Sequence, residues 1–291
     1  MRYEISLSIG YNYGALSDHA RTLVHLLPSD LPGRQTVSSR LLTVDPMPNE
    51  RRDTTDFFGN AMSVLAFHQP IDQIEFTLSA SAERLAPAGS LDLSPRLSDL
   101  AADIAAYRSL DPAAPHHFLG ASPRILQDPA IADFAASLRA PGSTVRQTVE
   151  AISNAVHAEM RFDPEATDVD TPAQEAFANR HGVCQDFSHI TITALRSLGI
   201  PAGYVSGFLR TIPPPGQPRL EGADAMHAWV SAWCGSEAGW IEVDPTNACI
   251  VGADHITVAH GRDYADVAPV KGVLRTSGDQ TSHHSVDVKP V

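Results

Sequence analysis

The chain has 291 residues, about twice the common domain size of ~150, so its length favours two domains or one domain with a large appendage. Hydrophobic residues make up 43% of it, and none of its apolar runs approaches the ~18 residues of a membrane span. We therefore expect a globular protein that does not insert into a membrane. The 34 acidic and 21 basic residues give a net charge of -13, which would repel phosphate backbones and argues against a nucleic-acid partner.

The cysteine content raises the first functional question. Cys184, Cys234 and Cys249 are an odd set that cannot form a paired disulfide framework, so each is either a buried filler or a reactive thiol. The first seven residues alternate polar and apolar side chains and lack the continuous apolar stretch of a secretory signal. This pattern predicts a cytoplasmic location.

The first third of the chain, to about residue 95, has the pattern of β structure. Apolar side chains recur at every second position in residues 3–9 and again in residues 74–80, and clusters of Pro, Gly and Asp separate such segments. We predict an antiparallel β-sandwich-like domain over residues 1–95. Residues 96–140, rich in Ala, Pro, Ser and Asp with one short helix near 97–110, are predicted to connect it to a core formed by residues 141–291.

The predicted core alternates helices and strands. Apolar residues at a helical spacing predict a helix that Ser143 or Thr144 caps, and a second helix that ends before Gly199. Strand patterns follow at residues 203–209, 227–233 and 240–243, and residues 285–288 have the pattern of a further strand. The predicted fold class is therefore α+β.

Cys184 lies directly before the second of these helices. The start of a helix has unsatisfied backbone N–H groups and the positive end of the helix dipole, both of which favour an anion. A thiol at such a position is biased toward the thiolate, which attacks acyl carbon, and the same N–H groups can hold the oxyanion that results. Cys234 and Cys249 precede no helix, and we expect them to be non-catalytic.

A thiolate of this kind needs a base, and the base needs an orienting partner. Residues 227–233 and 238–243 have the pattern of a hairpin. If Trp233 pairs with Ala238 across a four-residue loop, His227 lies directly opposite Asp244, with Cβ atoms ~5 Å apart. The carboxylate would then fix the tautomer of the imidazole, provided that the register does not slip by one residue.

These segments resemble a known family. The stretch from His181 to His189 around Cys184, the segment from His227 to Val230 and the Asp244-Pro245-Thr246 segment are similar to the three motifs of bacterial transglutaminase-like proteins, in order and spacing. Residues 56–60 (DFFGN) resemble the β-rich N-terminal region that accompanies that core, and residues 261–264 (GRDY) resemble a segment after the Asp motif, for which we expect a structural role. The resemblance implies a papain-like or transglutaminase-like core with a Cys on a helix packed on an antiparallel sheet.

The resemblance also implies a reaction. Cys184 would be the nucleophile, His227 the general base and acid, and Asp244 the orienting group in acyl transfer on a peptide or protein amide through a thioester. Water as the second nucleophile makes the enzyme a peptidase or amidase, and an amine makes it a transglutaminase. No cofactor or metal is expected. The candidates for the remaining oxyanion or cleft contacts are Gln174, Gln185 and Trp229, and the proline-rich segment 211–222 is expected at the cleft edge.

Three alternatives stay open at this point. His181, Cys184 and His189 have the residue types of a zinc site, although no Cys-x-x-Cys pair accompanies them. An arylamine-type N-acetyltransferase uses the same order of Cys, His and Asp, but it would need a coenzyme A site, which the acidic balance disfavours. A catalytically inactive peptide-binding module is the third. The oligomeric state is left open.

Overall fold

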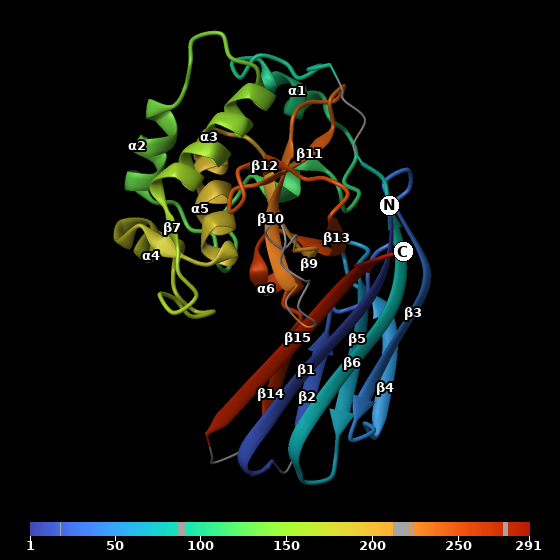
Figure 1. Ribbon diagram of the computed structural model, residues 1–291. Coiled ribbons are helices and arrows are strands. Elements are labelled where there is room, and N and C mark those ends of the chain that lie inside the picture. The colour runs from blue at the N-terminus through green and yellow to red at the C-terminus, as the bar shows by residue number, and fades with distance from the viewer. Residues whose placement is uncertain (18, 87–90, 212–221, 223, 276–278) are drawn as a thin grey trace, which may run out of the picture.

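The structure is a computed structural model that describes residues 1–17, 19–86, 91–211, 222, 224–275 and 279–291. Figure 1 shows two parts, a body of long strands and a sheet covered by helices on one side. All sheets of more than two strands are antiparallel. The predicted α+β fold, with a strand-rich N-terminal region before a helix-and-sheet core, is confirmed.

The strand-rich part consists of two four-stranded sheets. The first has the order β15 (Gln280–Pro290), β1 (Arg2–Ser17), β6 (Ile71–Arg84) and β3 (Gln35–Asp45). The second has the order β14 (Val270–Leu274), β2 (Ala20–Val24), β5 (Ala61–Phe67) and β4 (Glu50–Thr55). The alternating residues of β1 and β6 turn one face of the first sheet into the core, and every apolar residue of the two predicted faces is buried: Tyr3, Ile5, Leu7, Ile9, Ile74, Phe76, Leu78 and Ala80.

The C-terminal end of the chain belongs to this strand-rich part. β15 pairs with β1 over its whole length, and β14 pairs with β2. The predicted division therefore needs a correction, because residues 270–290 leave the core and complete the sheets that residues 1–84 begin (Figure 1). Without β15 and β14, the backbone edges of β1 and β2 would be exposed.

The core is built on a five-stranded sheet. Its order is β12 (Cys249–Ile250), β11 (Trp240–Asp244), β10 (Ala225–Trp233), β9 (Ala202–Leu209) and β13 (His255–Gly261). Helix α5 (Cys184–Ser197) packs on β10 and β9, and α2 (Pro129–Ser137), α3 (Val145–Glu159) and α4 (Ala173–Asn179) surround it. The remaining elements are short: α1 (Leu100–Ala106), the 3-10 helix η1 (Pro115–Phe118), α6 (Tyr264–Val267) and the parallel pair β7 (Arg161–Phe162) and β8 (His181–Gly182).

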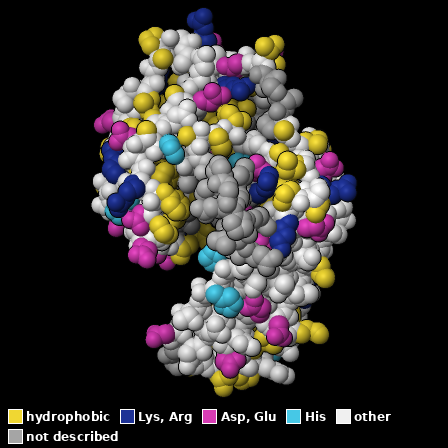
Figure 2. Space-filling view, in the orientation of Figure 1, with side chains coloured by type: hydrophobic (Ala, Val, Ile, Leu, Met, Phe, Trp, Pro, Cys, Tyr) yellow, Lys and Arg dark blue, Asp and Glu magenta, His cyan; other side chains and the backbone are white. Residues whose placement is uncertain are grey.

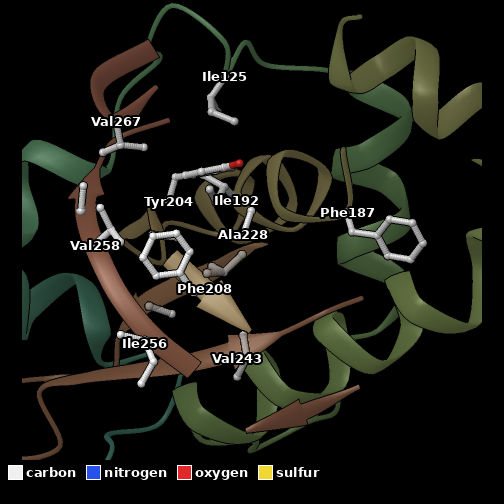
Figure 3. Close-up of a cluster of buried hydrophobic side chains, with 14 of the residues drawn as sticks. Ile125, Phe187, Ile192, Tyr204, Phe208, Ala228, Val243, Ile256, Val258 and Val267 are labelled. Atoms are coloured by element: carbon white, nitrogen blue, oxygen red, sulfur yellow. The ribbon is translucent and has the colours of Figure 1, made fainter. Parts of the chain in front are cut away.

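Two helices of the core show how local sequence sets the element ends. Thr144 caps α3 as predicted, and its hydroxyl accepts from the Gln147 N–H while the Gln147 side chain accepts from the Thr144 N–H, which satisfies two N–H groups at the helix start. Helix α5 is buried on every side from Gln185 to Leu195, because helices cover the faces that the sheet leaves free. Figure 3 shows Ile192 of α5 beside Tyr204 and Ala228 of the sheet, while Phe187 points away from the sheet.

The strand-rich part holds the core sheet at its edge strand β13. The side-chain amide of Gln35 accepts from the Thr257 N–H and donates to the Thr257 carbonyl, at 2.9 and 2.8 Å. The amide of Asn60 does the same for His260, at 2.8 and 2.7 Å. These two side chains take the place of a neighbouring strand, so the free edge of β13 is satisfied without another strand.

The pairing of β15 with β1 yields a stability test. Val286 on β15 is fully buried, whereas Val273 on β14 is 79% exposed. Val286→Ala should lower the free energy of unfolding by about 2 kcal/mol in urea denaturation, because it removes buried methyl groups. Val273→Ala is the matched control and should change it by less than ~0.5 kcal/mol. Equal effects of the two substitutions would show that β15 does not dock as described.

Candidate active site

Cys184 is the first residue of α5, and the residues before it fix the start of this helix. The Asp186 carboxylate accepts from the Val183 N–H at 2.8 Å and from the Thr167 hydroxyl at 2.6 Å, which closes the first turn. A Cβ atom on Gly182 would lie 2.5 Å from Asp186 Oδ2, so a larger residue at this position would push the carboxylate away. The thiol is therefore held by a rigid turn and stays partly exposed.

The first N–H groups of α5 are free to bind an anion. The N–H groups of Asp186 and Phe187 donate to the Val183 carbonyl. Those of Cys184 and Gln185 have no hydrogen-bond partner among the described residues. Two unsatisfied donors at a helix start, next to the thiol, form the kind of site that stabilises an oxyanion.

His227 and Asp244 meet across the hairpin of β10 and β11. His227 Nε2 donates to Asp244 Oδ2 at 2.8 Å, and both side chains are buried. The predicted register is wrong by two residues, because Trp233 pairs with Trp240 and the loop is longer than four residues. The shift by two keeps both side chains on the same face of the sheet, so they meet as diagonal neighbours instead of directly opposite ones.

Asp244 is fully buried and accepts five hydrogen bonds. Its Oδ2 accepts from His227, from His255 Nε2 at 3.0 Å and from Asn247 Nδ2 at 2.7 Å. Its Oδ1 accepts from the N–H groups of Thr246 and Asn247, at 2.9 and 3.1 Å. Burial alone would raise the pKa of this carboxyl, but the donors outweigh it and hold the pKa well below its usual range.

His227 is held as an imidazolium by its two neighbours. Burial of the ring lowers its pKa, whereas the hydrogen bonds and charges of Asp244 and Cys184 outweigh burial and raise the pKa to about 10. Since Asp244 takes Nε2, Nδ1 is the ring nitrogen left for the Cys184 sulfur. At neutral pH the site therefore carries a protonated base beside the thiol.

His255 is a site residue that the sequence analysis missed. It begins β13 and reaches the Asp244 carboxylate across the sheet, while its ring packs edge-on against Trp229 with centroids 5.2 Å apart. The signal was present as a His in a strand-like segment, but nothing in the sequence relates β13 to β11, which β10 and β9 separate in the sheet order.

The structure gives other hydrogen-bond partners to the side chains of two of the three oxyanion or cleft candidates. The indole N–H of Trp229 donates to Glu242 Oε2 at 3.0 Å inside the core, so it is not free for a substrate. The Gln185 amide donates to the Val169 carbonyl at 3.1 Å and fixes the loop before α4. Gln174 is exposed on α4. The N–H groups of Cys184 and Gln185 are better placed for the role.

Comparisons with known proteins agree with this geometry. A model of the transglutaminase-like superfamily matches residues 132–245, and a model of the bacterial transglutaminase-like N-terminal region matches residues 3–83. An uncharacterised protein of Mycobacterium tuberculosis (strain H37Rv) is 31% identical over 302 residues, which cover 99% of this chain and 93% of the relative. The chain belongs to the transglutaminase-like superfamily.

Two further comparisons show how much of the chain is shared with other proteins. An uncharacterised protein of Mycobacterium leprae is 39% identical over 136 residues, which cover 46% of each chain. The crystal structure of a candidate cysteine protease from Cytophaga hutchinsonii superposes with a TM-score of 0.74 at 22% identity, over 99% of this chain and 90% of that one, and so shares the fold. The strand-rich part and the core thus occur together in a second protein.

The transglutaminase-like core leaves the zinc alternative without support. Among the described residues, the one group of potential ligands whose atoms lie within 4.8 Å of one another is His227, Asp244 and His255, so the grouping of His181, Cys184 and His189 is wrong. His189 Nε2 accepts from the Tyr264 N–H at 3.2 Å, and burial lowers the pKa of His189 to about 4.

The GRDY segment of the transglutaminase-like chain docks on α5. Besides the bond of Tyr264 to His189, Asp263 caps α6 and accepts from the Arg124 N–H at 2.8 Å, and Arg196 of α5 donates to the Arg262 carbonyl at 2.7 Å. These contacts fit the structural role that we expected for this segment.

The remaining predictions concern the other cysteines and the surroundings. Cys234 is buried, and burial raises its pKa to about 12; burial and the Asp244 charge raise that of Cys249 to about 11.

Residues 212–221 of the predicted cleft-edge segment lie outside the described residues. On the face in Figure 2, the basic side chains of the described residues are scattered among acidic ones. No helix of the described chain is long and apolar enough to cross a membrane.

Glu242 links the active-site sheet to the strand-rich part. It accepts from Trp229, from Arg34 Nη1 at 2.6 Å and from the buried Arg84 Nη2 at 3.4 Å. Glu242→Gln should lower the free energy of unfolding by about 3–5 kcal/mol, because it leaves Arg84 as an uncompensated buried charge. Glu237→Gln, at an exposed position in the turn of the same hairpin, is the control and should change it by less than ~0.5 kcal/mol. Urea denaturation measures both, and similar values would contradict the described ion pairs.

Proposed function

We propose that this protein is a cysteine-dependent acyl-transfer enzyme that acts on peptide or protein amides through a thioester on Cys184. The observation that carries the proposal is the buried His227, bound to Asp244 at 2.8 Å, whose pKa is raised by Asp244 and by Cys184 at the start of α5. The family, which is one of cysteine-based catalysis, supports the same chemistry.

The first half-reaction follows from the charges of the site. The Cys184 thiolate attacks the amide carbonyl, and the oxyanion that forms accepts from the N–H groups of Cys184 and Gln185. The tetrahedral adduct collapses when the C–N bond breaks, and the leaving amine takes the proton of His227. The products are a thioester, a free amine and a neutral His227 that still donates to Asp244 through Nε2.

The second half-reaction uses the same residues in the opposite direction. Neutral His227 takes a proton from the incoming water or amine through Nδ1, and that nucleophile attacks the thioester. The C–S bond breaks, the acyl group leaves as a carboxylic acid or a new amide, and the imidazolium and thiolate are restored. The chain holds two lysines, Lys271 and Lys289, so it has few acceptors for crosslinking to itself. We favour hydrolysis or transfer on peptide substrates.

The nucleophile assignment is tested by selective alkylation. Iodoacetamide should modify Cys184 in the native protein well ahead of Cys234 and Cys249, because those two thiols have raised pKa values and no adjacent imidazolium. Peptide mapping after short exposure measures the three rates. His227→Ala should slow the alkylation of Cys184 at neutral pH at least tenfold, and equal rates at all three cysteines would overturn the assignment.

The reaction class is tested with a glutamine-containing peptide, with and without an added primary amine. Amine incorporation with ammonia release identifies a transferase, and peptide cleavage identifies a protease. Cys184→Ser should lower kcat/KM by about 1,000-fold or more, whereas Cys234→Ser and Cys249→Ser should keep it within about twofold. Binding of the peptide without any turnover would favour a peptide-binding module instead.

A further inference from the structure

Two histidines share one oxygen of the Asp244 carboxylate. His227 and His255 come from β10 and β13, which lie on either side of β9, and each approaches Oδ2 through Nε2, at 2.8 and 3.0 Å. A triad needs only the first of these bonds. His255 is 5% exposed, and the reaction proposed above does not use it.

The hydrogen bonds of His255 define its tautomer. Its Nδ1 accepts from the Gly252 N–H at 3.4 Å, so this nitrogen carries no proton. The proton of the neutral ring then lies on Nε2 and is donated to Asp244. His255 is therefore a neutral donor to the carboxylate, whereas His227 beside it is an imidazolium.

The same geometry argues against a metal ion between the three side chains. A metal-bound histidine donates its second ring N–H to an acceptor. The group that faces His255 Nδ1 is a backbone N–H, which is itself a donor. A metal on Nε2 would set two N–H groups against each other, so the cluster fits a hydrogen-bonded unit and not a metal site.

The strand that carries His255 is fixed from both sides. Asp254, the residue before it, accepts from the Tyr3 hydroxyl of β1 at 2.8 Å and from Arg210 at 3.1 Å. Two residues after it, Thr257 is bound by the Gln35 amide. A side chain held in this way is preorganised to donate in one direction.

We propose that His255 is a positioning residue of this active site, which shares the Asp244 carboxylate with His227 and thereby limits how tightly that carboxylate holds the proton of His227. The inference rests on the proposed function. His227 must give its proton to the leaving amine and recover it in each turnover, and a carboxylate with fewer donors would oppose the first of these steps.

The loss of the His255 donor should change the titration of His227 in a defined direction. With one donor fewer, Asp244 is more basic and attracts the imidazolium proton more strongly, so the pKa of His227 should rise by about one unit above its value of about 10. Loosening of the site would do the opposite, because it would weaken the bond to Asp244. The titratable groups that face His227 and Asp244 are Cys184, Cys249 and His255.

The test is an NMR titration of the His227 ring in the full chain. His255→Leu and His255→Asn remove the donor and should both raise the pKa of His227, because Asn is too short to reach Asp244 in place of Nε2. His255→Gln places an amide N–H near the position of Nε2 and should restore the wild-type titration. His25→Leu removes a histidine that is buried to the same extent, 6% exposed, and should leave it unchanged.

A double variant shows whether the effect passes through Asp244. In the Asp244→Asn background, His255→Leu should cause no further shift of His227, whereas independent effects would add. The proposal would be overturned if the pKa of His227 fell in His255→Leu or His255→Asn, or if His255→Gln did not restore the wild-type titration. Additive effects in the double variant would also overturn it. So would the finding that the wild-type protein binds zinc stoichiometrically and that His255→Gln loses this zinc.

The readout separates this proposal from the proposed function. The titration needs no substrate, and selective alkylation of Cys184 is measured on the same samples. If Cys184 is alkylated selectively but the His227 titration is unchanged in His255→Leu and His255→Asn, the role of His255 is refuted and the proposed function is not. Where turnover of a peptide is found, kcat should fall about tenfold in these two variants with little change in KM, because His255 is buried and acts through Asp244.

Discussion

The buried carboxylate of Asp244 is the constraint on which the candidate active site depends. A charged group without solvent is tolerated only when donors surround it, and five are present here. They come from β10, from β13 and from the turn that follows β11. These three segments must lie in register before the carboxylate can exist as an anion, so the site forms only when the sheet is folded. The protonation of His227 follows from the charge of Asp244, because an anion at Nε2 keeps the imidazole protonated on the side of Cys184.

The strand-rich part helps to position this site through β13. This strand has β9 on one side only, and its other edge is satisfied by side chains of the strand-rich part, the amides of Gln35 and Asn60. The contact of Tyr3 with Asp254 lies next to His255. Since β14 and β15 follow the core in the chain and return to the sheets of residues 1–84, the core is inserted between strands of the other part. The two parts share one continuous buried cluster, which explains why they form one structure in this family member.

Much of the site was predictable because the relevant patterns are local. Cys184 at a helix start and the alternation of β10 and β11 follow from short-range periodicity, and the fold class follows from the order of the elements. The predicted register was wrong by two residues, yet the prediction that His227 meets Asp244 survived, because strand side chains alternate with period two. His255, and the return of the C-terminal strands to the sheets of residues 1–84, were missed for the opposite reason. Each depends on a pairing between segments that are far apart in sequence or in the sheet, and such pairings leave no periodic signal. Apolar spacing predicted α5 itself, but not that its remaining faces are buried by other helices.

Two carboxylates of β11 show how partners decide the role of a residue. Glu242 and Asp244 lie two positions apart on the same face of the same strand, and both are buried. Two arginines bind Glu242, and an arginine keeps its proton at any pH that a protein meets, so these ion pairs hold structure. Histidines face Asp244, and a histidine can lose and regain a proton, so this carboxylate can take part in chemistry. Trp229 lies between the two, with its N–H on Glu242 and its ring against His255. The ion pairs that join the strand-rich part to the core thus support, through the Trp229 indole, the His255 ring that donates to the Asp244 carboxylate.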